Sequence, residues 1–295
     1  HAWMLGLIPT EEIYRELMGR VNSPTRIKDI TSALDERNHS LFHSLTQKVV
    51  NRILEIELQR GDSETQVTRL AEELHRVYGA ETLIRILQAF GKDTFIRDSY
   101  NWNNTKRGVL SSLLHACYPS PDDDSDTLKS LAGQADISHI RLVEAAMFAP
   151  QWLELTEKAT GWKGLESAAY YFHAHTSECF DDKKKAIIAR YTPIAIEDLQ
   201  EGAFDIDWFK EAYKTIGKER FEVVYNAAKY ISLSNTHTRA RKFADAVNGK
   251  TKAADAKKEI IAKRNKDLLM SYGLIPLGRK ADKELLERYQ FLQKF

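Results

Sequence analysis

Cysteine, proline and long apolar runs are scarce in this chain of 295 residues. The two cysteines, Cys117 and Cys179, provide no disulfide framework, which favours a reducing compartment. Residues 109–121 carry no charged residue, but this run contains serines, a histidine and two prolines and is shorter than the ~18 apolar residues of a membrane helix. These absences exclude a disulfide-rich secreted domain and a helical membrane span, and the sequence predicts a cytoplasmic protein.

The features of a complete chain are also missing at both ends. Residues 1–9 begin without Met and lack the basic start and the cleavage site of a signal peptide. Residues 283–295 have an amphipathic pattern that stops on an apolar residue without a capping residue. We therefore expect the sequence to be a segment of a longer polypeptide.

The composition is that of a folded protein. Apolar residues make up 43% of the chain and charged residues 29%, which is typical of globular proteins rather than of disordered tails. The net charge is only +1, but residues 239–295 hold 15 Lys and Arg against 7 Asp and Glu. That region therefore carries a charge of +8, and residues 1–238 carry −7. Any partner attracted by positive charge is expected at the C-terminal end.

Apolar residues recur at helical spacing along nearly the whole chain, whereas the alternation typical of strands is almost absent. Leu41, Leu45, Val49 and Ile53, for example, predict a long helix that ends at Gly61. Ser63 and Gln66 resemble a capping box and predict a further helix that ends at Gly79. The pattern predicts an all-α fold of antiparallel helical hairpins that form an α-solenoid-like or irregular helical array.

An acidic segment marks the best candidate for a domain boundary. Pro119 and Pro121 end a predicted helix, and four aspartates follow between residues 122 and 126. We predict an N-terminal helical subdomain at residues 1–117, an acidic loop and short connector at 118–136, and a C-terminal helical subdomain at 137–295 that is truncated at its end. One continuous domain is the alternative.

Seven aromatic residues are spread over two predicted helices that meet at Gly217, and Asp205 and Asp207 precede the first helix like caps. Aromatic side chains can stack on nucleic-acid bases, but this helical spacing favours the core of a hairpin. The seven are Phe204, Trp208, Phe209, Tyr213, Phe221, Tyr225 and Tyr230.

Motifs of nucleotide binding and of triad hydrolysis are missing. Gly249-Lys250-Thr251 has the end of a phosphate-binding loop, but Ala244 stands where the loop requires its first glycine. GxGxxG and GxSxG do not occur. We predict no catalytic residue and no cofactor.

Histidines provide the remaining candidates for chemistry. On a helix, His175 shares a face with Cys179 but not with His173, and two ligands do not complete a zinc site. His39 and His43 lie one turn apart near a predicted helix boundary, which favours a capping or surface role. An enzyme site near His173, His175 and Cys179 is kept as an alternative, and no metal is predicted.

Basic residues near the C-terminus form the one candidate binding surface. If they line one face, they could neutralise phosphates or receive an acidic partner, although acidic residues between them are also typical of a solvated helix face. The members of this predicted basic surface are Arg239, Arg241, Lys242, Lys257, Lys258, Lys263, Arg264 and Lys266.

Residues 149–178, with PQW at 150–152, GW at 161–162 and YYFHAH at 170–175, resemble an interior part of large uncharacterised bacterial proteins of the molybdate-metabolism-regulator-like type. The resemblance continues at residues 202–209, 239–246, 265–270 and 289–295, and it covers the C-terminal half better than the N-terminal half. It implies a helical region that precedes a C-terminal domain of unknown function, and it brings no catalytic motif.

Three functional hypotheses follow. The first is a helical scaffold or protein-interaction module within a larger bacterial cytoplasmic protein, with other domains of the same polypeptide or another protein as partners. The second is nucleic-acid binding through the basic C-terminal helices, which would weaken steeply with salt. The third is the enzyme site around the two histidines and Cys179, and no membrane partner is expected.

Overall fold

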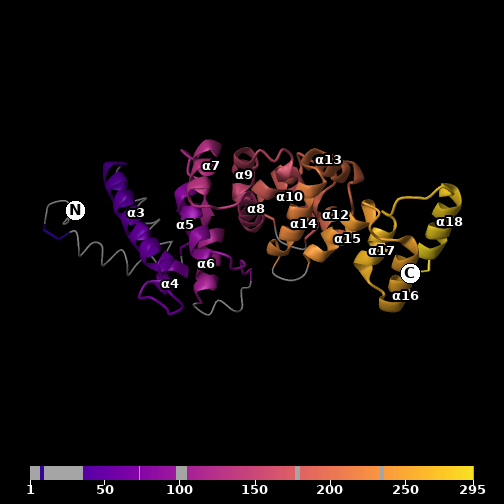
Figure 1. Cartoon of the computed structure of the whole chain (residues 1–295), viewed down its shortest axis with the longest axis horizontal. Helices are drawn as coiled ribbons and strands as arrows, with labels where there is room; N and C mark the ends of the chain where they lie inside the picture. The colour runs from indigo at the N-terminus through magenta and orange to yellow at the C-terminus, as the bar shows by residue number, and fades with distance from the viewer. Residues whose placement is uncertain are drawn as a thin grey trace. The chain divides into compact units, whose positions relative to one another are not determined.

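The computed structural model describes residues 7–9, 36–72, 74–97, 105–176, 180–232 and 236–294 (Figure 1). Within these residues the protein consists of helices α3 to α18, two 3-10 helices and one pair of two-residue strands. The prediction of an all-α fold is confirmed, whereas the solenoid-like arrangement stays a prediction. The helices predicted before residue 36, and the side chains of His39 and His43, lie outside the described residues.

The chain forms two compact units, His1–Leu155 and Thr156–Phe295. Residues 118–136, where the sequence predicted a boundary, lie within the first unit. The predicted division into residues 1–117, 118–136 and 137–295 stays a prediction.

The first unit combines helices of different lengths with two short strands. In chain order these elements are α3 (Glu36–Leu58), α4 (Thr68–Glu72), β1 (Val77–Tyr78), α5 (Ala80–Phe90), α6 (Lys106–His115), β2 (Cys117–Tyr118), α7 (Ser125–Gln134), α8 (His139–Phe148) and η1 (Pro150–Trp152). The helix α9 (Leu153–Thr160) follows, and the second unit begins within it.

The two strands correct one prediction. They pair in parallel with Val77 opposite Cys117, and the Val77 amide donates to the carbonyl of Ala116 at 2.9 Å. The helix predicted from Ser63 to Gly79 is wrong in its second half, because α4 ends at Glu72. Val77 and Tyr78 are of residue types that favour strands, and a partner about 40 positions away supplies the hydrogen bonds that a helix would otherwise make.

The first unit has its core on the inner faces of α5, α6 and α8. Helix α5 buries six residues along one face, among them Leu83, Leu87 and Phe90. The Trp152 indole is also buried and donates from Nε1 to the carbonyl of Cys117 at 2.7 Å. The tryptophan thereby satisfies a polar group at the edge of the strand pair while its ring fills the core.

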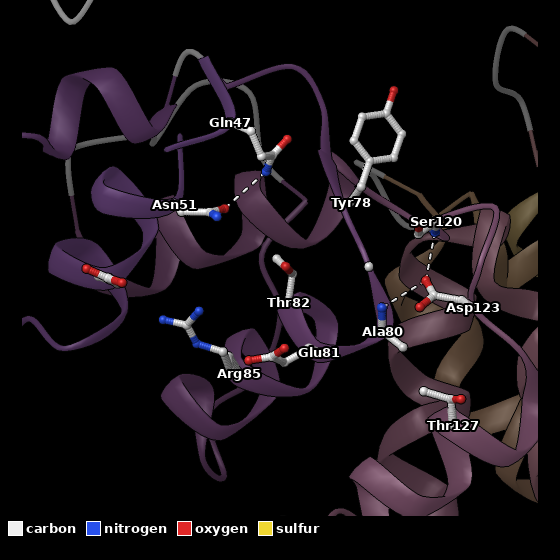
Figure 2. Close-up of a pocket in the computed structure, with 12 residues that line it drawn as sticks. Gln47, Asn51, Tyr78, Ala80, Glu81, Thr82, Arg85, Ser120, Asp123 and Thr127 are labelled. Atoms are coloured by element: carbon white, nitrogen blue, oxygen red, sulfur yellow. Dashed lines mark hydrogen bonds between the residues drawn. The ribbon is translucent and has the colours of Figure 1, made fainter. Parts of the chain in front are cut away.

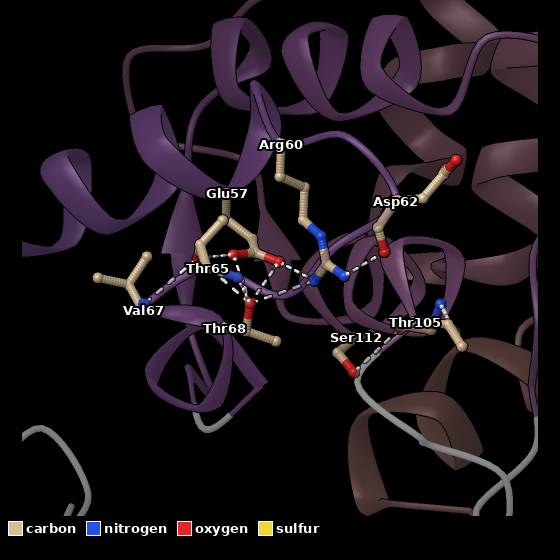
Figure 3. A network of polar contacts seen from close by, with 9 residues as sticks. Glu57, Arg60, Asp62, Thr65, Val67, Thr68, Thr105 and Ser112 are labelled. Atoms are coloured by element: carbon tan, nitrogen blue, oxygen red, sulfur yellow. Dashed lines mark hydrogen bonds and ion pairs between the residues drawn. The ribbon is translucent and has the colours of Figure 1, made fainter.

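A buried polar network closes the end of α3 (Figure 3). Arg60 Nη1 lies 2.5 Å from Glu57 Oε1, and the two side chains are 1% and 0% exposed. Thr65 Oγ1 donates to Glu57 Oε2 at 2.7 Å, and Thr68 Oγ1 contacts the same oxygen at 3.1 Å. Arg60 Nη2 also reaches the carbonyl of Asp62 at 3.4 Å. The network holds the turn between α3 and α4 in one conformation.

The second unit consists of helices throughout its described residues. In chain order they are α10 (Leu165–Ala174), α11 (Asp182–Ile188), α12 (Ile196–Glu201), α13 (Ile206–Ile216), α14 (Lys218–Ala227), η2 (Ala228–Tyr230), α15 (His237–Val247), α16 (Ala253–Lys263), α17 (Lys266–Tyr272) and α18 (Ala281–Leu292).

Aromatic rings form the core of α10, α13 and α14. Tyr171 is buried, donates to the carbonyl of Ala240 at 2.8 Å and lies 5.0 Å from the Phe209 ring. Each of the seven aromatic residues singled out in the sequence is buried or half-buried, which agrees with their interpretation as core residues. Asp205 caps α13, because its Oδ1 accepts from the Trp208 amide at 2.9 Å.

The last three helices share a separate small core. Tyr272 of α17 and Phe291 of α18 are nearly fully buried, with ring centroids 5.3 Å apart. Ile260 of α16 and Leu268 of α17 belong to the same cluster. Phe291 therefore attaches α18 to α16 and α17.

Candidate functional site

Two residues of the predicted basic surface bind to the N-terminal end of α17. Arg239 donates from Nε to Asp267 Oδ1 at 2.8 Å and from Nη1 to the carbonyl of Gln200. Lys242 donates to Asn265 Oδ1 at 3.2 Å and lies 4.0 Å from Asp267 Oδ2. Both side chains are partly buried, so much of their charge is compensated within the second unit.

Arg241 is likewise engaged within the second unit. Its Nε donates to the carbonyl of Tyr225 and its Nη2 to that of Asn226, each at 2.9 Å. Its guanidinium carbon lies 4.9 Å from the centroid of the Tyr225 ring. Burial lowers the pKa of Arg241, and Tyr225 and Asp245 partly offset this effect. These contacts position α15 against α14.

The remaining members of the predicted basic surface are exposed. Lys263 pairs with Glu259 at 3.0 Å, and Lys257 Nζ lies 5.1 Å from the centroid of the Phe291 ring. The structure thus brings α16 beside α18. The exposed members lie on α16, in the turn that follows it and at the start of α17, and they are Lys257, Lys258, Lys263, Arg264 and Lys266.

Helix α18 leaves an apolar face in solvent. Leu285, Leu286 and Tyr289 are 57%, 56% and 60% exposed, and Leu292 is 36% exposed. Positions four and seven residues apart lie on one side of a helix, so Leu285, Tyr289 and Leu292 form one stripe with Leu286 beside it. We call these four residues the α18 face.

The other side of α18 is firmly attached. Arg288 is 3% exposed and binds the carbonyl of Ile275 from Nη1 and Glu284 Oε1 from Nη2. Glu284 Oε2 accepts from the Gly278 amide at 2.7 Å. This hydrogen bond, followed by the contact with Arg288, lowers the pKa of Glu284. The α18 face is therefore presented by a helix with a fixed orientation on α16 and α17.

The histidines of the alternative enzyme site lie in the core of the second unit. His173 is 0% exposed and His175 1%. His175 Nδ1 lies 2.8 Å from the carbonyl of Tyr171, and its ring centroid lies 5.4 Å from that of Phe204. Burial lowers the pKa of His175 to about 4, so this imidazole is neutral at pH 7. Cys179 lies outside the described residues, and its proximity to the histidines stays a prediction.

A polar pocket of about 530 Å³ opens in the first unit (Figure 2). Gln47 and Asn51 of α3 line one side, and Gln47 Nε2 donates to Asn51 Oδ1 at 3.0 Å. Tyr78 of β1 contributes a half-exposed ring, and the start of α5 and residues 120–127 complete the walls.

Asp123 fixes two walls of this pocket to each other. Its Oδ2 accepts from the Ala80 amide at 2.9 Å and from the Ser120 amide at 2.7 Å. Ala80 is the first residue of α5, so a carboxylate satisfies a free amide at the positive end of that helix. Asp123 is therefore a structural residue of the pocket.

Two charged residues of α5 face the same pocket. Glu81 and Arg85 are four positions apart, and both line the cavity, as Figure 2 shows. Glu81 is exposed and Arg85 is half-buried. Among the described residues neither has an ion-pair partner. Glu81 and Arg85 thus offer a carboxylate and a guanidinium without an ion-pair partner to a ligand.

The described residues include neither a candidate metal centre nor a candidate membrane helix. No group of three or more His, Cys, Asp and Glu side chains there could hold a metal ion. No helix there is long and apolar enough to cross a membrane. Cys117 is a buried free thiol, and burial followed by the charge of Asp123 raises its pKa.

The fold and these surfaces define an all-α protein with an exposed apolar helix face and a polar pocket. The sequence profile described as "Family of unknown function (DUF5724)" matches residues 1–295, and the chain belongs to this family. Comparisons with curated proteins and with solved structures gave no match. The function of this family is unknown.

Sequence reasoning missed both features. The signal for the α18 face was present in the sequence. Leu285, Leu286, Tyr289 and Leu292 add four apolar residues to a helix in which Phe291 is the one fully buried apolar residue, beside the buried Arg288. The pocket had no comparable signal, since its walls come from segments around residues 50, 80 and 123.

Proposed function

We propose that the chain is a helical protein-interaction module that binds a partner through the α18 face. The observation that carries this proposal is the exposure of Leu285, Leu286 and Tyr289, each more than half accessible on one side of one helix. Large apolar side chains gathered on a surface are typical of interaction sites, and an exposed helix face suits an amphipathic partner helix. The anchoring of α18 through Arg288 and Phe291 supports the proposal, because a fixed helix loses little entropy on binding.

The surrounding charge determines the chemistry of the partner. Residues 253–294 hold 10 Lys and Arg against 6 Asp and Glu. The exposed lysines of α16 lie beside α18, as the contact of Lys257 with the Phe291 ring indicates. A partner helix with apolar residues at i, i+4 and i+7 and acidic residues beside them complements both properties. We therefore propose that the partner of the α18 face is an acidic amphipathic helix.

Burial of the α18 face contributes part of the free energy of binding. Full burial of a leucine side chain contributes about 1.5–3 kcal/mol, and the α18 face leaves somewhat more than half of each large residue to be buried. Three such residues together give roughly 3–5 kcal/mol before the costs of association. Charge complementarity adds to the association rate and makes it dependent on salt.

The proposal is tested with two labelled peptides that carry leucines at heptad spacing, one flanked by glutamates and one by lysines. Binding is measured by fluorescence anisotropy on the wild type, on the variant L285S/L286S/Y289S and on the control Q290S, which changes an exposed polar residue of the same helix. We expect the acidic peptide to bind the wild type and Q290S, and to bind the triple variant at least about tenfold more weakly.

Other outcomes contradict the proposal in distinct ways. Equal binding of the acidic and basic peptides would refute the role of charge, and binding that the triple variant leaves intact would refute the α18 face. Self-association that disappears in the triple variant would show that a second copy covers the face. Circular dichroism of each variant verifies that the helices are retained.

A second candidate function is nucleic-acid binding, and the five exposed residues of the predicted basic surface favour it. With Arg239, Arg241 and Lys242 engaged internally, about five phosphates is the largest number this surface could neutralise. Binding should then fall with the salt concentration, with a logarithmic slope of at most about 5 in magnitude. Titration with single- and double-stranded nucleic acid at low and moderate salt tests it, and K257E/K258E/R264E should abolish binding.

We also infer that the chain works in the bacterial cytoplasm as part of a larger protein of the molybdate-metabolism-regulator-like type. The strings at residues 149–178 and 239–246 support the type, and the small number of cysteines supports a reducing compartment. Fractionation of cells that produce the natural protein, with an antibody against this chain, tests the inference. Recovery outside the cytoplasm, or of a band no longer than this chain, would contradict it.

A further inference from the structure

The pocket of the first unit is a second place where a ligand can bind, and it is independent of the α18 face. Its defining feature is the pair Glu81 and Arg85, which line the cavity from one side of α5 (Figure 2). We propose that this pocket binds a small zwitterion of the α-amino-acid class, with the ligand carboxylate on Arg85 and the ligand ammonium group on Glu81.

The unpaired state of these two side chains is the first argument. A glutamate four residues before an arginine on a helix ordinarily forms a favourable ion pair. Glu81 and Arg85 have this spacing, yet no ion pair links them to each other or to other described residues. A ligand that carries both charges can satisfy them together, because a guanidinium donates two parallel hydrogen bonds to a carboxylate, and a carboxylate accepts hydrogen bonds from an ammonium group.

The remaining charges exclude simpler ligands. Asp123 already accepts two amide hydrogen bonds, and Glu55 pairs with Arg52 at 3.1 Å. A plain anion would bind Arg85 in a pocket that also contains Glu55, Glu81 and Asp123, which repel it. A plain cation would leave the half-buried guanidinium of Arg85 without a counter-charge. A zwitterion meets neither difficulty.

The other walls indicate which side chain the ligand carries. Gln47 and Asn51 use one donor and one acceptor on each other, which leaves the Gln47 carbonyl and the Asn51 amide protons for a polar group. The Tyr78 ring, 45% exposed, gives an apolar contact at the rim. A volume of about 530 Å³ accommodates an amino acid with a long polar side chain, or a dipeptide. The lining therefore favours amide-bearing ligands such as glutamine.

Isothermal titration with the free L-amino acids and with glutamine-containing dipeptides, at millimolar concentration, tests the proposal. Each ligand that binds is compared with its N-acetyl and its C-terminal amide derivative, which lack one of the two charges. The protein variants are R85M and E81Q, with R69M as a control that removes an exposed arginine outside the pocket. None of these side chains is in the buried core, so the variants should fold.

The expected result is binding of at least one zwitterion, weakened about tenfold or more in R85M and in E81Q and unchanged in R69M. Both derivatives of that ligand should bind about tenfold more weakly than the zwitterion. Absence of binding by every ligand, equal binding of the derivatives, or an equal loss in R69M would each overturn the proposal. The variant L285S/L286S/Y289S should retain this binding, so the result is independent of the function proposed for α18.

Discussion

Removal of one partner of the Glu57–Arg60 ion pair should destabilise the first unit far more than removal of both. The two side chains are almost completely buried, and Thr65 and Thr68 provide two further hydrogen bonds to the Glu57 carboxylate. In E57Q the buried guanidinium of Arg60 loses the charge of Glu57, and in R60M the carboxylate of Glu57 loses the charge of Arg60. Each single change should lower the free energy of unfolding by about 3–5 kcal/mol.

The double variant E57L/R60M should behave differently. It removes both charges and fills the space with apolar atoms, so the desolvation cost of the ions disappears together with their attraction. The hydroxyl groups of Thr65 and Thr68 lose an acceptor, which costs about 1–3 kcal/mol. The double variant should therefore lose roughly 1–3 kcal/mol instead of the 6–10 kcal/mol that two independent changes would give.

Urea unfolding followed by circular dichroism at neutral pH measures these differences. For an unfolding slope of about 2 kcal/mol per molar urea, a loss of 4 kcal/mol lowers the midpoint of the first unit by about 2 M. The coupling energy from the four proteins of the cycle should be at least about 3 kcal/mol. Additive losses, or a loss below about 1 kcal/mol in E57Q, would refute the interpretation of this pair as a buried ionic contact.

Three further predictions concern other residues. Burial lowers the pKa of His175 to about 4 in the folded protein, below its value of about 6.5 in the unfolded chain, so the unfolded state binds the proton more readily. The free energy of unfolding should therefore fall by about 3 kcal/mol as the pH decreases from 6.5 to 4. Urea titrations at several pH values should show this dependence in the wild type and should lack it in H175F. Gly164 and Gly161 both have positive φ, but an added Cβ at Gly164 would lie 2.8 Å from Thr215 Cγ2, whereas one at Gly161 would meet open space. The free energy of unfolding, measured by thermal unfolding, should fall by about 1 kcal/mol in G161A and by about 2–4 kcal/mol in G164A. Equal losses in the two variants would contradict this packing. Because burial raises the pKa of the Cys117 thiol, a C179S variant should react with a thiol reagent at pH 8 only as it unfolds in urea, and rapid labelling of the folded protein would contradict the burial of Cys117.

The sequence predicted those elements whose signals are local. The first of the two helices predicted to meet at Gly217 corresponds to α13, Ile206–Ile216, and Asp205 has the capping role expected of it. Helical periodicity and capping preferences act within a few residues, so one sequence suffices to recognise them. The helix predicted for Val77 and Tyr78 was wrong, because these residues pair with Cys117 and Tyr118, about 40 positions away, and local spacing does not reveal such a pairing.

The candidate sites were less predictable for the same reason. Eight basic residues share one stretch of sequence, but Arg239, Arg241 and Lys242 bind carbonyl and carboxylate groups from other helices, which spacing along the chain does not reveal. Residues four positions apart on a helix share a face, so the spacing of Glu81 and Arg85 alone places them together. The cavity beside them is formed with α3 and residues 120–127, which the sequence around Glu81 does not reveal. Exposure of the α18 face was implicit in the number of apolar residues in that helix, which exceeds what one contact with the core can cover.

The short strand pair has a consequence for the order in which the first unit assembles. Joining residues 77–78 to 117–118 closes a loop of about 40 residues, at an entropic cost of roughly 3 kcal/mol for a flexible chain. Two strands of two residues cannot repay that cost alone, so they should pair only after α5 and α6 have docked. The amides of Val77 and Gly79, which donate to the carbonyls of Ala116 and Tyr118, then become natural reporters for hydrogen exchange: their protection should appear last during refolding and should measure the closure of the whole unit.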